Sequence, residues 1–225
     1  GSAGRLGTRF AHVLSESGAN VVLVDIDEQK NKKLEKTLIQ KYKANTMSSN
    51  TDISNQNEVR KLAKDVLKKY GKIDVLINNA HFVPRDHPQR DAPFEKYSLD
   101  LWDKATKINM RGLFLCYQEF GKVMVKQKNG VIVNISSIYG IKGSDQRIYG
   151  KSRLNTPPFY ATTKGGVVNF TRYLAAYWHR KNIRVNTLSP GGVKDETYQK
   201  SDFIKKYSDK TILGRMAEKT EYNGA

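Results

Sequence analysis

Short apolar runs alternate along this chain with longer stretches of helical periodicity, and this alternation constrains the fold more than any other feature. Strands are predicted over 21–24, 73–77, 131–135 and 183–188, where apolar and β-branched residues cluster. Helices are predicted over 6–17, 28–43, 55–70, 99–127 and 160–180, where apolar residues recur at helical spacing. Continuous apolar strands between helices are typical of a parallel sheet that is covered on both faces. The sequence therefore predicts an α/β protein with a doubly wound parallel sheet.

The net charge raises the question of a nucleic-acid partner. The chain carries 39 lysines and arginines against 22 acidic residues, a net charge of +17. The excess is dispersed, at +5, +4 and +8 in residues 1–75, 76–150 and 151–225, and no nucleic-acid-binding motif accompanies it. A dispersed excess of lysine is typical of a solvated surface, so we expect no nucleic-acid partner.

Length and composition fit a single domain that spans residues 1–225. No apolar run approaches the roughly 18 residues that a membrane helix needs, so we expect no membrane partner. The single cysteine, Cys116, lies in an apolar stretch and excludes an intrachain disulfide. Together these features predict a cytoplasmic protein in a reducing compartment.

A glycine-rich segment precedes the first predicted helix. Gly1, Gly4 and Gly7 form a GxxGxxG pattern that leads directly into that helix. Glycines permit a tight turn and a close approach of a pyrophosphate to the backbone, and a helix N-terminus supplies N–H groups and the positive end of its dipole. Glycine clusters are also common in simple turns, so this pattern needs support from a second feature.

Asp25 supplies that support. It ends the strand over 21–24, 18 residues after Gly7, where a carboxylate can accept hydrogen bonds from both ribose hydroxyls of an adenosine. The same carboxylate would repel a 2′-phosphate, and no arginine follows it directly, so NAD(H) is favoured over NADP(H). Asp25 could also cap the helix over 28–43, and the two roles can coexist. The glycines and Asp25 together predict a dinucleotide-binding Rossmann fold.

Tyr160 and Lys164 lie four residues apart in a predicted helix and therefore share one face. A tyrosine with a pKa of about 10 is a poor base at neutral pH. An ammonium group one turn away, together with a positively charged nicotinamide, is expected to lower the pKa of Tyr160. Ser136 and Ser137 follow the strand over 131–135, where ligands meet an open α/β sheet, and either serine could face the site.

Three further polar residues carry information by their position. Asn78 and Asn79 end another strand and are followed by Ala80, and Asn109 lies inside a long predicted helix, where a polar side chain is unusual. With the glycine segment and the tyrosine–lysine pair, these motifs resemble the short-chain dehydrogenase/reductase family across essentially the whole chain. The motifs that carry the resemblance, in chain order, are GxxGxxG, Asp25, Asp52, Asn78-Asn79-Ala80, Asn109, Ser137, Tyr160-xxx-Lys164 and Pro190-Gly191.

The resemblance implies an NAD(H)-dependent oxidoreductase that interconverts a secondary alcohol and a ketone, and it implies no metal. Tyr160 would be the general acid/base, Lys164 would lower its pKa, Ser137 would bind the substrate oxygen, and Asn109 would hold a water of the proton relay. The implied cofactor site comprises Gly1, Gly4, Arg5, Leu6, Gly7, Asp25, Ile26, Asp52, Ile53, Asn79, Ala80, Tyr160, Lys164, Pro190, Gly191 and Val193.

The chain departs from the usual pattern of the family in ways that bear on the substrate. His81 stands where a glycine commonly follows Asn-Asn-Ala, and Ser137 and Tyr160 are 23 residues apart, about ten more than in the shorter branch. The segments around this insertion look like oxidoreductases of flagellin-glycan and nonulosonic-acid sugar pathways. An anionic substrate, such as a nucleotide-linked or acidic sugar, would suit the nearby cations, which otherwise belong to solvated loops. These cations are Arg85, His87, Arg90, Lys142, Arg147, Lys151 and Arg153.

Two other functions fit the same motifs. A nucleotide-sugar epimerase or dehydratase could use the same tyrosine, and a non-catalytic NAD-binding protein could keep the fold. The resemblance also implies a homo-dimer or tetramer through the helices over 99–127 and 160–180. Apolar surface for such contacts is expected at Trp102, Phe120, Tyr173, Tyr177 and Trp178.

The ends of the chain affect the predicted sheet. A glycine loop of this kind follows the carboxyl end of a strand, so a first strand is expected ahead of Gly1. Residues 221–225 are predicted to begin a helix whose following strand is also missing. A sheet that lacks its first and its C-terminal strand is expected to fold poorly.

Overall fold

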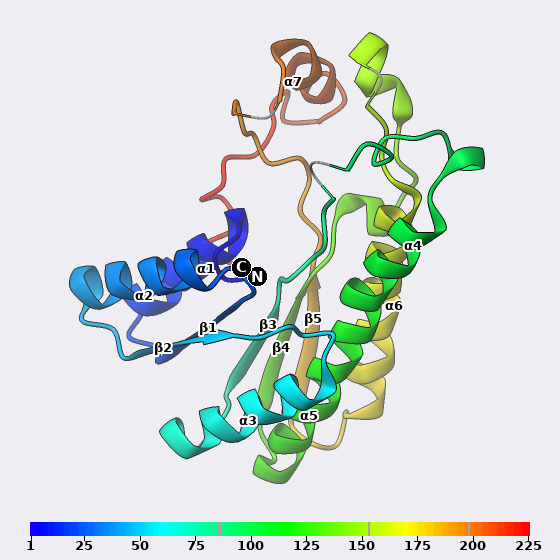
Figure 1. Ribbon diagram of the computed structural model, residues 1–225. Helices are drawn as coiled ribbons and strands as arrows, with labels where there is room; N and C mark the ends of the chain where they lie inside the picture. Colours follow the sequence, from blue (N-terminus) through cyan, green and yellow to red (C-terminus); the bar gives the residue numbers. More distant parts are fainter. Residues whose placement is uncertain (85–86, 153, 198) are drawn as a thin grey trace.

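The computed structural model describes residues 1–84, 87–152, 154–197 and 199–225. Five parallel strands form two sheets (Figure 1), and this confirms the predicted α/β fold class. One sheet pairs β1 (Val21–Asp25) with β2 (Thr46–Asn50). The other has the order β3 (Val75–Asn78), β4 (Gly130–Ile135), β5 (Ile183–Leu188), with Asn78 opposite Asn134 and Asn134 opposite Thr187.

Helices follow the strands in regular succession. The α-helices are α1 (Arg5–Glu16), α2 (Glu28–Tyr42), α3 (Gln56–Tyr70), α4 (Leu99–Thr106), α5 (Leu113–Gln127), α6 (Pro158–Tyr177) and α7 (Ser201–Ser208). Three short 3₁₀ segments are η1 (Phe94–Lys96), η3 (Ile138–Gly140) and η4 (Gln146–Ser152), and a π-helical segment, η2 (Lys107–Gly112), joins α4 to α5. None of the described helices is long and apolar enough to span a bilayer.

Side-chain caps fix several helix starts where the sequence predicts them. Asp27 accepts a hydrogen bond from the backbone N–H of Lys30 and caps α2, so Asp25 does not cap it. Asn55 caps α3 in the same way, through the N–H groups of Asn57 and Glu58. Because Asp25 is released from capping, its carboxylate can serve the glycine loop instead.

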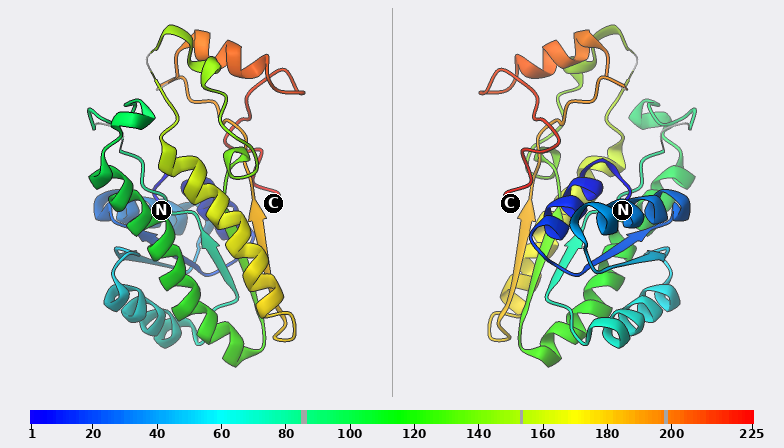
Figure 2. Two further views of the ribbon diagram at one scale, coloured as in Figure 1. Left: turned by 90° about the vertical axis from the view of Figure 1, so that its right-hand side faces the viewer. Right: turned by 90° about the vertical axis from the view of Figure 1, so that its left-hand side faces the viewer.

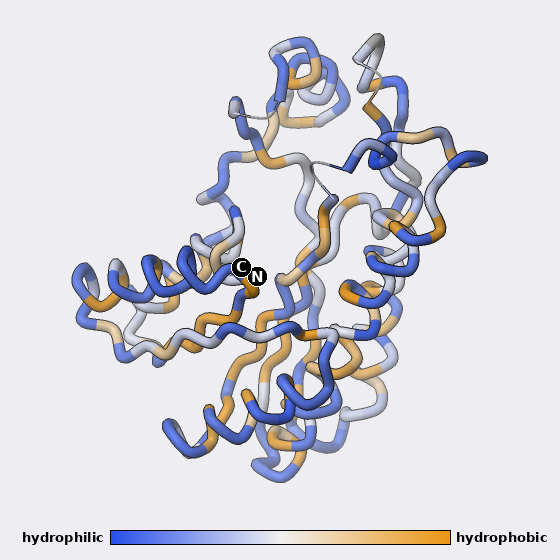
Figure 3. Tube along the Cα trace, viewed as in Figure 1, coloured by the Kyte–Doolittle hydropathy of each residue, from blue (hydrophilic) through white to orange (hydrophobic). Residues whose placement is uncertain are grey.

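The main core lies between the second sheet and the helices α3, α5 and α6. It is built from residues such as Leu62, Phe120, Ile132 and Val185. Figure 2 shows the helices beside this sheet, and in Figure 3 the apolar parts of the trace gather there. Strand β5 alternates in burial, with Ile183 and Val185 buried. Its intervening residues, Arg184 and Asn186, are exposed. The alternating part of this strand therefore buries one face only.

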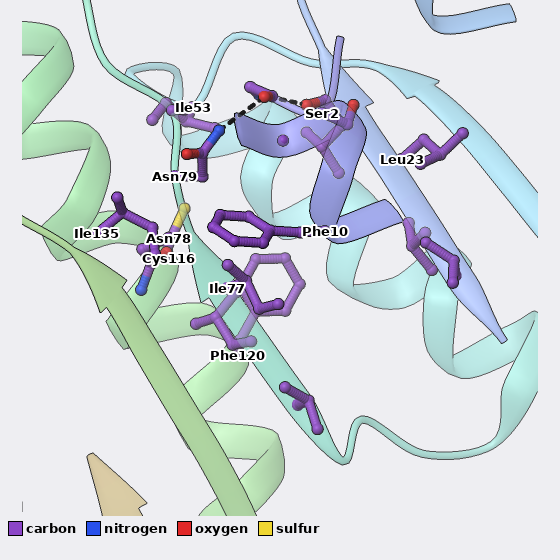
Figure 4. Close-up of a pocket in the computed structure, with 18 of the residues that line it drawn as sticks. Ser2, Phe10, Leu23, Ile53, Ile77, Asn78, Asn79, Cys116, Phe120 and Ile135 are labelled. Carbon is purple, nitrogen blue, oxygen red and sulfur yellow. Dashed lines mark hydrogen bonds between the residues drawn. The ribbon is translucent and has the colours of Figure 1, made fainter. Parts of the chain in front are cut away.

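A cavity of about 490 Å³ separates the two sheets (Figure 4). Residues of β1 and β3 line it from either side, together with Phe10 of α1 and Cys116 and Phe120 of α5. The glycine segment begins at one end of this space, where the Gly1 ammonium donates a hydrogen bond to the carbonyl oxygen of Val24. The cavity therefore lies beside the glycine segment, between β1 and β3.

Several local predictions are wrong. The sequence does not predict β2, α7 or the interruption of the 99–127 helix by η2, and residues 221–225 form turns rather than the start of a helix. Phe120 and Trp178 are buried, with 7% and 8% of their surface exposed, instead of leaving apolar surface as predicted. Tyr173 and Tyr177 are exposed as predicted. Cys116 is a buried free thiol, and burial raises its pKa to about 12.

Candidate active site

Tyr160 and Lys164 lie one turn apart in the first half of α6, next to the carboxyl end of β4. Lys164 Nζ donates a 2.7 Å hydrogen bond to the carbonyl oxygen of Ile135, the last residue of β4. The same Nζ lies 5.9 Å from the centroid of the Tyr160 ring. Lys164 is buried, with 6% of its surface exposed, so its amine is surrounded by protein rather than by solvent at the carboxyl end of β4.

The two serines after β4 have different surroundings. Ser136 Oγ donates a 2.8 Å hydrogen bond to the carbonyl oxygen of Lys164, which ties the strand end to α6. Ser137 caps η3 by accepting a hydrogen bond from the N–H of Tyr139, and it lies within hydrogen-bonding reach of Tyr160. Of the two serines that the sequence leaves open, Ser137 is the one that meets the tyrosine.

Burial sets the direction of the pKa shift of both Tyr160 and Lys164. Burial raises the pKa of Tyr160, and the hydrogen bond with Ser137 opposes that rise. Burial also lowers the pKa of Lys164 from 10.5 to about 8. Burial therefore dominates the pKa of Tyr160 in this structure, and the Lys164 amine faces the carbonyl oxygen of Ile135. The lowering of the Tyr160 pKa by Lys164 together with a positively charged nicotinamide stays a prediction.

Asn109 lies in the π-helical segment η2, a deviation from α-helix that is frequent at functional sites. Its Oδ1 accepts a 2.7 Å hydrogen bond from the N–H of Phe82, so η2 is tied to the segment after β3. Its Nδ2 is buried and has no hydrogen-bond partner among the described residues. Asn109 thus holds a free donor close to the other candidate residues.

The glycine segment forms a close-packed cradle at the start of α1. A Cβ on Gly7 would collide with the Gly1 carbonyl oxygen and would lie 2.9 Å from Asn79 Nδ2, so a side chain is excluded there. No described side chain caps α1, whose first turn holds Arg5 and Leu6. The free N–H groups of this helix end and the excluded side chains fit a pyrophosphate. Gly1, Gly4 and Gly7 therefore form a close-packed turn that leads into an uncapped helix N-terminus.

Asp25 closes the other side of this cradle. One carboxylate oxygen accepts a 2.9 Å hydrogen bond from the N–H of Ala3, and the other accepts a 3.0 Å bond from the N–H of Asp27. The carboxylate keeps 13% of its surface exposed, which leaves lone pairs free for ribose hydroxyls. Ile26 follows with 72% of its surface exposed and extends this rim.

Asp52 and Ile53 follow β2 and are engaged locally. Asp52 Oδ1 accepts hydrogen bonds of 2.8 Å from both the N–H and the Oγ of Ser54, and the Asp52 side chain is exposed. Ile53 packs against the core next to Gly112 and lines the cavity. The structure therefore places Ile53 near the predicted cofactor residues, while it gives Asp52 a turn-forming role.

The segment after β5 lies over the site. Pro190 accepts a hydrogen bond from Ile138 N–H. Val193 forms a parallel bridge with Ala217. Past Val193, Asp195 makes an ion pair with Arg5 of the glycine segment, a contact that the sequence analysis misses. This ion pair joins the glycine segment to the segment after β5.

The insertion between Ser137 and Tyr160 packs against α7. Tyr149 stacks on Phe203 with ring centroids 5.5 Å apart, and Ile148 and Tyr207 are buried in the same cluster. Lys142 is exposed, and Arg147 is 82% exposed and held by Asp145. Among the other predicted cations, Arg85, Arg153 and the Lys151 side chain lie outside the described residues. The described cations of the insertion therefore face solvent, and its apolar residues do the packing.

Known proteins resemble this chain over most of its length. The family described as Enoyl-(Acyl carrier protein) reductase matches residues 1–225. A 3-oxoacyl-(acyl-carrier-protein) reductase of Aquifex aeolicus is 30% identical over 98% of this chain and 84% of its own length. An acetoacetyl-CoA reductase of Acinetobacter is 29% identical over 100% of this chain and 86% of its own length.

Solved structures show the same fold. A short-chain dehydrogenase of Leptospira borgpetersenii with bound NAD+ superposes with a TM-score of 0.84 at 31% identity, covering 100% of this chain and 80% of that one. A gluconate 5-dehydrogenase of Burkholderia cenocepacia in complex with NADP and tartrate superposes with a TM-score of 0.85 at 27% identity, covering 100% and 83%. The two cofactors differ between these neighbours.

Proposed function

Because the chain belongs to the short-chain dehydrogenase/reductase family, we propose that it is an NAD(H)-dependent oxidoreductase that interconverts a secondary alcohol and a ketone of a small molecule. The observation that carries this proposal is the meeting of Tyr160, Ser137 and Lys164 at the carboxyl end of β4. The glycine cradle and Asp25 lie at the same edge of the fold, where a dinucleotide fits.

Three candidate catalytic residues have separate roles in this reaction. Bound NAD(H) supplies the hydride exchange with the substrate carbon. Tyr160 donates its proton to the carbonyl oxygen during reduction and accepts the hydroxyl proton during oxidation. Ser137 donates a hydrogen bond to the same oxygen, and the Lys164 ammonium stabilises the phenolate that Tyr160 forms.

The preference for NAD(H) rests on Asp25. A 2′-phosphate at the adenosine ribose would meet this carboxylate, and charge repulsion would weaken binding. The carboxylate is fixed by the N–H groups of Ala3 and Asp27 and cannot turn away without losing both bonds. The family includes neighbours with either cofactor, so Asp25 is the discriminating feature of this chain.

The proposed substrate is a small carbonyl or hydroxyl compound. Within this class, we propose an anionic sugar. One described cation supports the sugar. Burial raises the pKa of Tyr149, and the charge of nearby Arg90 opposes that rise. Arg90 Nε makes no hydrogen bond within the described part of the chain and lies 3.7 Å from Asp91 Oδ1 in an ion pair. A guanidinium group in this position suits a carboxylate or phosphate. Arg147 does not support it, because Asp145 holds that side chain in solvent.

The aromatic surface of α5 and α6 supports a homo-dimer or tetramer. Tyr173 and Tyr177 stack on one another and expose 59% and 66% of their surface, and Phe114 of α5 exposes 47%. Exposed aromatic groups of this size favour protein contacts. The buried free thiol of Cys116 supports a cytoplasmic location.

Replacement of Tyr160 by Phe tests the function. The Tyr160→Phe protein is expected to bind NADH normally, as followed by fluorescence, and to lose turnover of a carbonyl panel by about a hundredfold or more. Full turnover in this variant would refute the assignment. Analysis of the products separates net redox from epimerisation or dehydration, for which no NADH is consumed overall. A non-catalytic protein would bind NADH and turn over no member of the panel.

A further inference from the structure

His81 lies directly against the candidate catalytic tyrosine. It follows Ala80 at the end of β3, and its ring meets the Tyr160 ring edge to face, with centroids 5.2 Å apart and planes at 86°. A second contact, tilted at 41°, joins His81 to Phe159 at 6.3 Å. A glycine at this position, as is common in the family pattern, would leave both aromatic rings of α6 without this neighbour.

Two polar atoms in this region are buried and unpartnered. His81 Nε2 has no hydrogen-bond partner among the residues that the structure describes, and the same holds for Asn109 Nδ2. The two side chains line the same cavity as Lys164. They are also linked through the backbone, because Asn109 Oδ1 accepts the N–H of Phe82, the residue after His81. Buried polar groups without a partner call for a ligand or an ordered water.

The chemistry of the two atoms is complementary. The amide nitrogen of Asn109 can only donate hydrogen bonds. A neutral imidazole has one nitrogen that accepts, and burial together with the charge of Lys164 lowers the pKa of His81 well below its usual value. A water molecule that accepts from Asn109 and donates to His81 would satisfy both atoms at once. The groups with charge or titratable protons that face this position are Lys164 and Tyr160.

We propose that His81 is a positioning residue of the active centre, which fixes the Tyr160 ring by edge-to-face packing and shares a buried water with Asn109. The proposal rests on the proposed function, because it gives His81 its task through Tyr160. It also gives a role to the histidine at a position where the family pattern commonly has glycine. Ring packing and water binding are separable, since different substitutions remove each of them.

Three variants separate the two contributions. His81→Phe keeps an aromatic ring and removes the nitrogen, His81→Gln keeps a hydrogen-bonding group and removes the ring, and His81→Gly removes both. With NADH and an accepted ketone, we expect His81→Phe to lower kcat about tenfold while the KM for NADH stays within about twofold. The pH dependence of kcat in His81→Gln is expected to lie closer to that of the wild type than the pH dependence in His81→Phe does. His81→Gly is expected to show the largest loss.

A second readout needs no turnover. Nitrogen-15 NMR of the imidazoles, with His81 assigned by its absence in His81→Phe, reports the charge and tautomer of this ring. We expect a neutral ring at pH 7 whose Nε2 resonance moves when Asn109 is replaced by Leu, because the shared water loses its donor. Thermal melts of each variant confirm that the protein is folded.

The two readouts distinguish the possible failures. If His81→Gln keeps the wild-type kcat, the positioning of Tyr160 by ring packing is overturned. If His81→Phe keeps the wild-type kcat and Asn109→Leu leaves the Nε2 resonance in place, the shared water is overturned. An Nε2 resonance that moves only when NADH or the ketone is added would show that a reactant, and not a water, is the partner, and would overturn the shared-water part. If the resonance responds to Asn109→Leu but no carbonyl compound is reduced by the wild-type protein, the proposed function fails and the shared water stands.

Discussion

Asn79 Nδ2 donates a 2.8 Å hydrogen bond to the carbonyl oxygen of Gly1, across 78 positions of sequence. This bond joins the carboxyl end of β3 to the glycine segment, and Gly7 packs against both partners so closely that a Cβ would not fit. The shape of the cradle is therefore set by β3 as much as by the glycines themselves. Figure 4 shows the bond at the rim of the cavity.

Replacement of Asn79 by Ala is expected to weaken NADH binding. Loss of one partly buried hydrogen bond costs about 1–2 kcal/mol, which corresponds to roughly a tenfold rise in the dissociation constant. Fluorescence titration with NADH measures this effect. Asn57→Ala, at an exposed position of α3, is the matched control and is expected to bind NADH as the wild type does. Equal affinities for both variants would contradict the role of the Asn79–Gly1 bond.

Replacement of Asp25 by Ser is expected to shift cofactor preference toward NADP(H). The serine removes the charge that repels a 2′-phosphate, so the ratio of kcat/KM for NADPH over NADH should rise about tenfold or more. Asp27→Ser is the control, because that carboxylate is two residues away and is engaged in the cap of α2 and in an ion pair with Lys30. A preference that moves equally in both variants would show that Asp25 does not contact the ribose.

The burial of Lys164 predicts a pH-dependent stability. Its pKa is lowered from 10.5 to about 8 in the folded protein, so between these values the unfolded chain binds more protons. The free energy of unfolding should therefore rise with pH across that window, by on the order of 3 kcal/mol at most, and the full penalty should persist below pH 8. Urea unfolding at pH 7.5, 9 and 10.5 measures the slope.

Comparison with Lys164→Met isolates this contribution from that of other titrating groups. The difference in stability between the variant and the wild type should shrink as the pH rises through the window. Lys36→Met, at an exposed position of α2, should show no such trend. A difference that is constant with pH would mean that Lys164 keeps its ordinary pKa.

The strand pattern could be predicted where apolar residues carry it, and could not be predicted for β2. Residues Thr46–Asn50 are mostly polar, and long-range side-chain bonds hold them in the sheet. Glu35 of α2 accepts hydrogen bonds from the N–H and Oγ of Ser48. The buried Asn31 donates to the carbonyl oxygen of Ser49. Periodicity contains no signal for such partners, because they lie on a different element.

Part of the candidate site could be predicted from the sequence, and part of it could not. Tyr160 and Lys164 could be placed together because four residues along a helix bring side chains to one face. The contact of His81 with Tyr160 and the ion pair of Arg5 with Asp195 depend on tertiary packing, and no spacing predicts them. His81 was visible only as a departure from a family pattern.

The stacking of Tyr149 on Phe203 predicts that the insertion anchors α7. Phe203→Ala should speed hydrogen exchange of the amides over 201–208, because the aromatic contact at 5.5 Å is lost. The KM for the carbonyl substrate is expected to rise severalfold while NADH affinity stays unchanged. Phe94→Ala is the control, since that ring is 73% exposed. Unchanged exchange over 201–208 would contradict the anchoring role.

The cavity between β1 and β3 predicts that an added strand would stabilise the protein. Both strands line the cavity with apolar residues, and the Gly1 ammonium is buried at one end, where desolvation lowers its pKa. Five or six apolar residues fused ahead of Gly1 would replace this ammonium by a neutral amide, pair with both strand edges and fill the space. Burial of several apolar side chains should outweigh the entropy of ordering them by on the order of 3 kcal/mol. Urea unfolding measures the gain, and a glycine–serine extension of equal length is the control; equal midpoints for the two extensions would show that the cavity does not accept a strand.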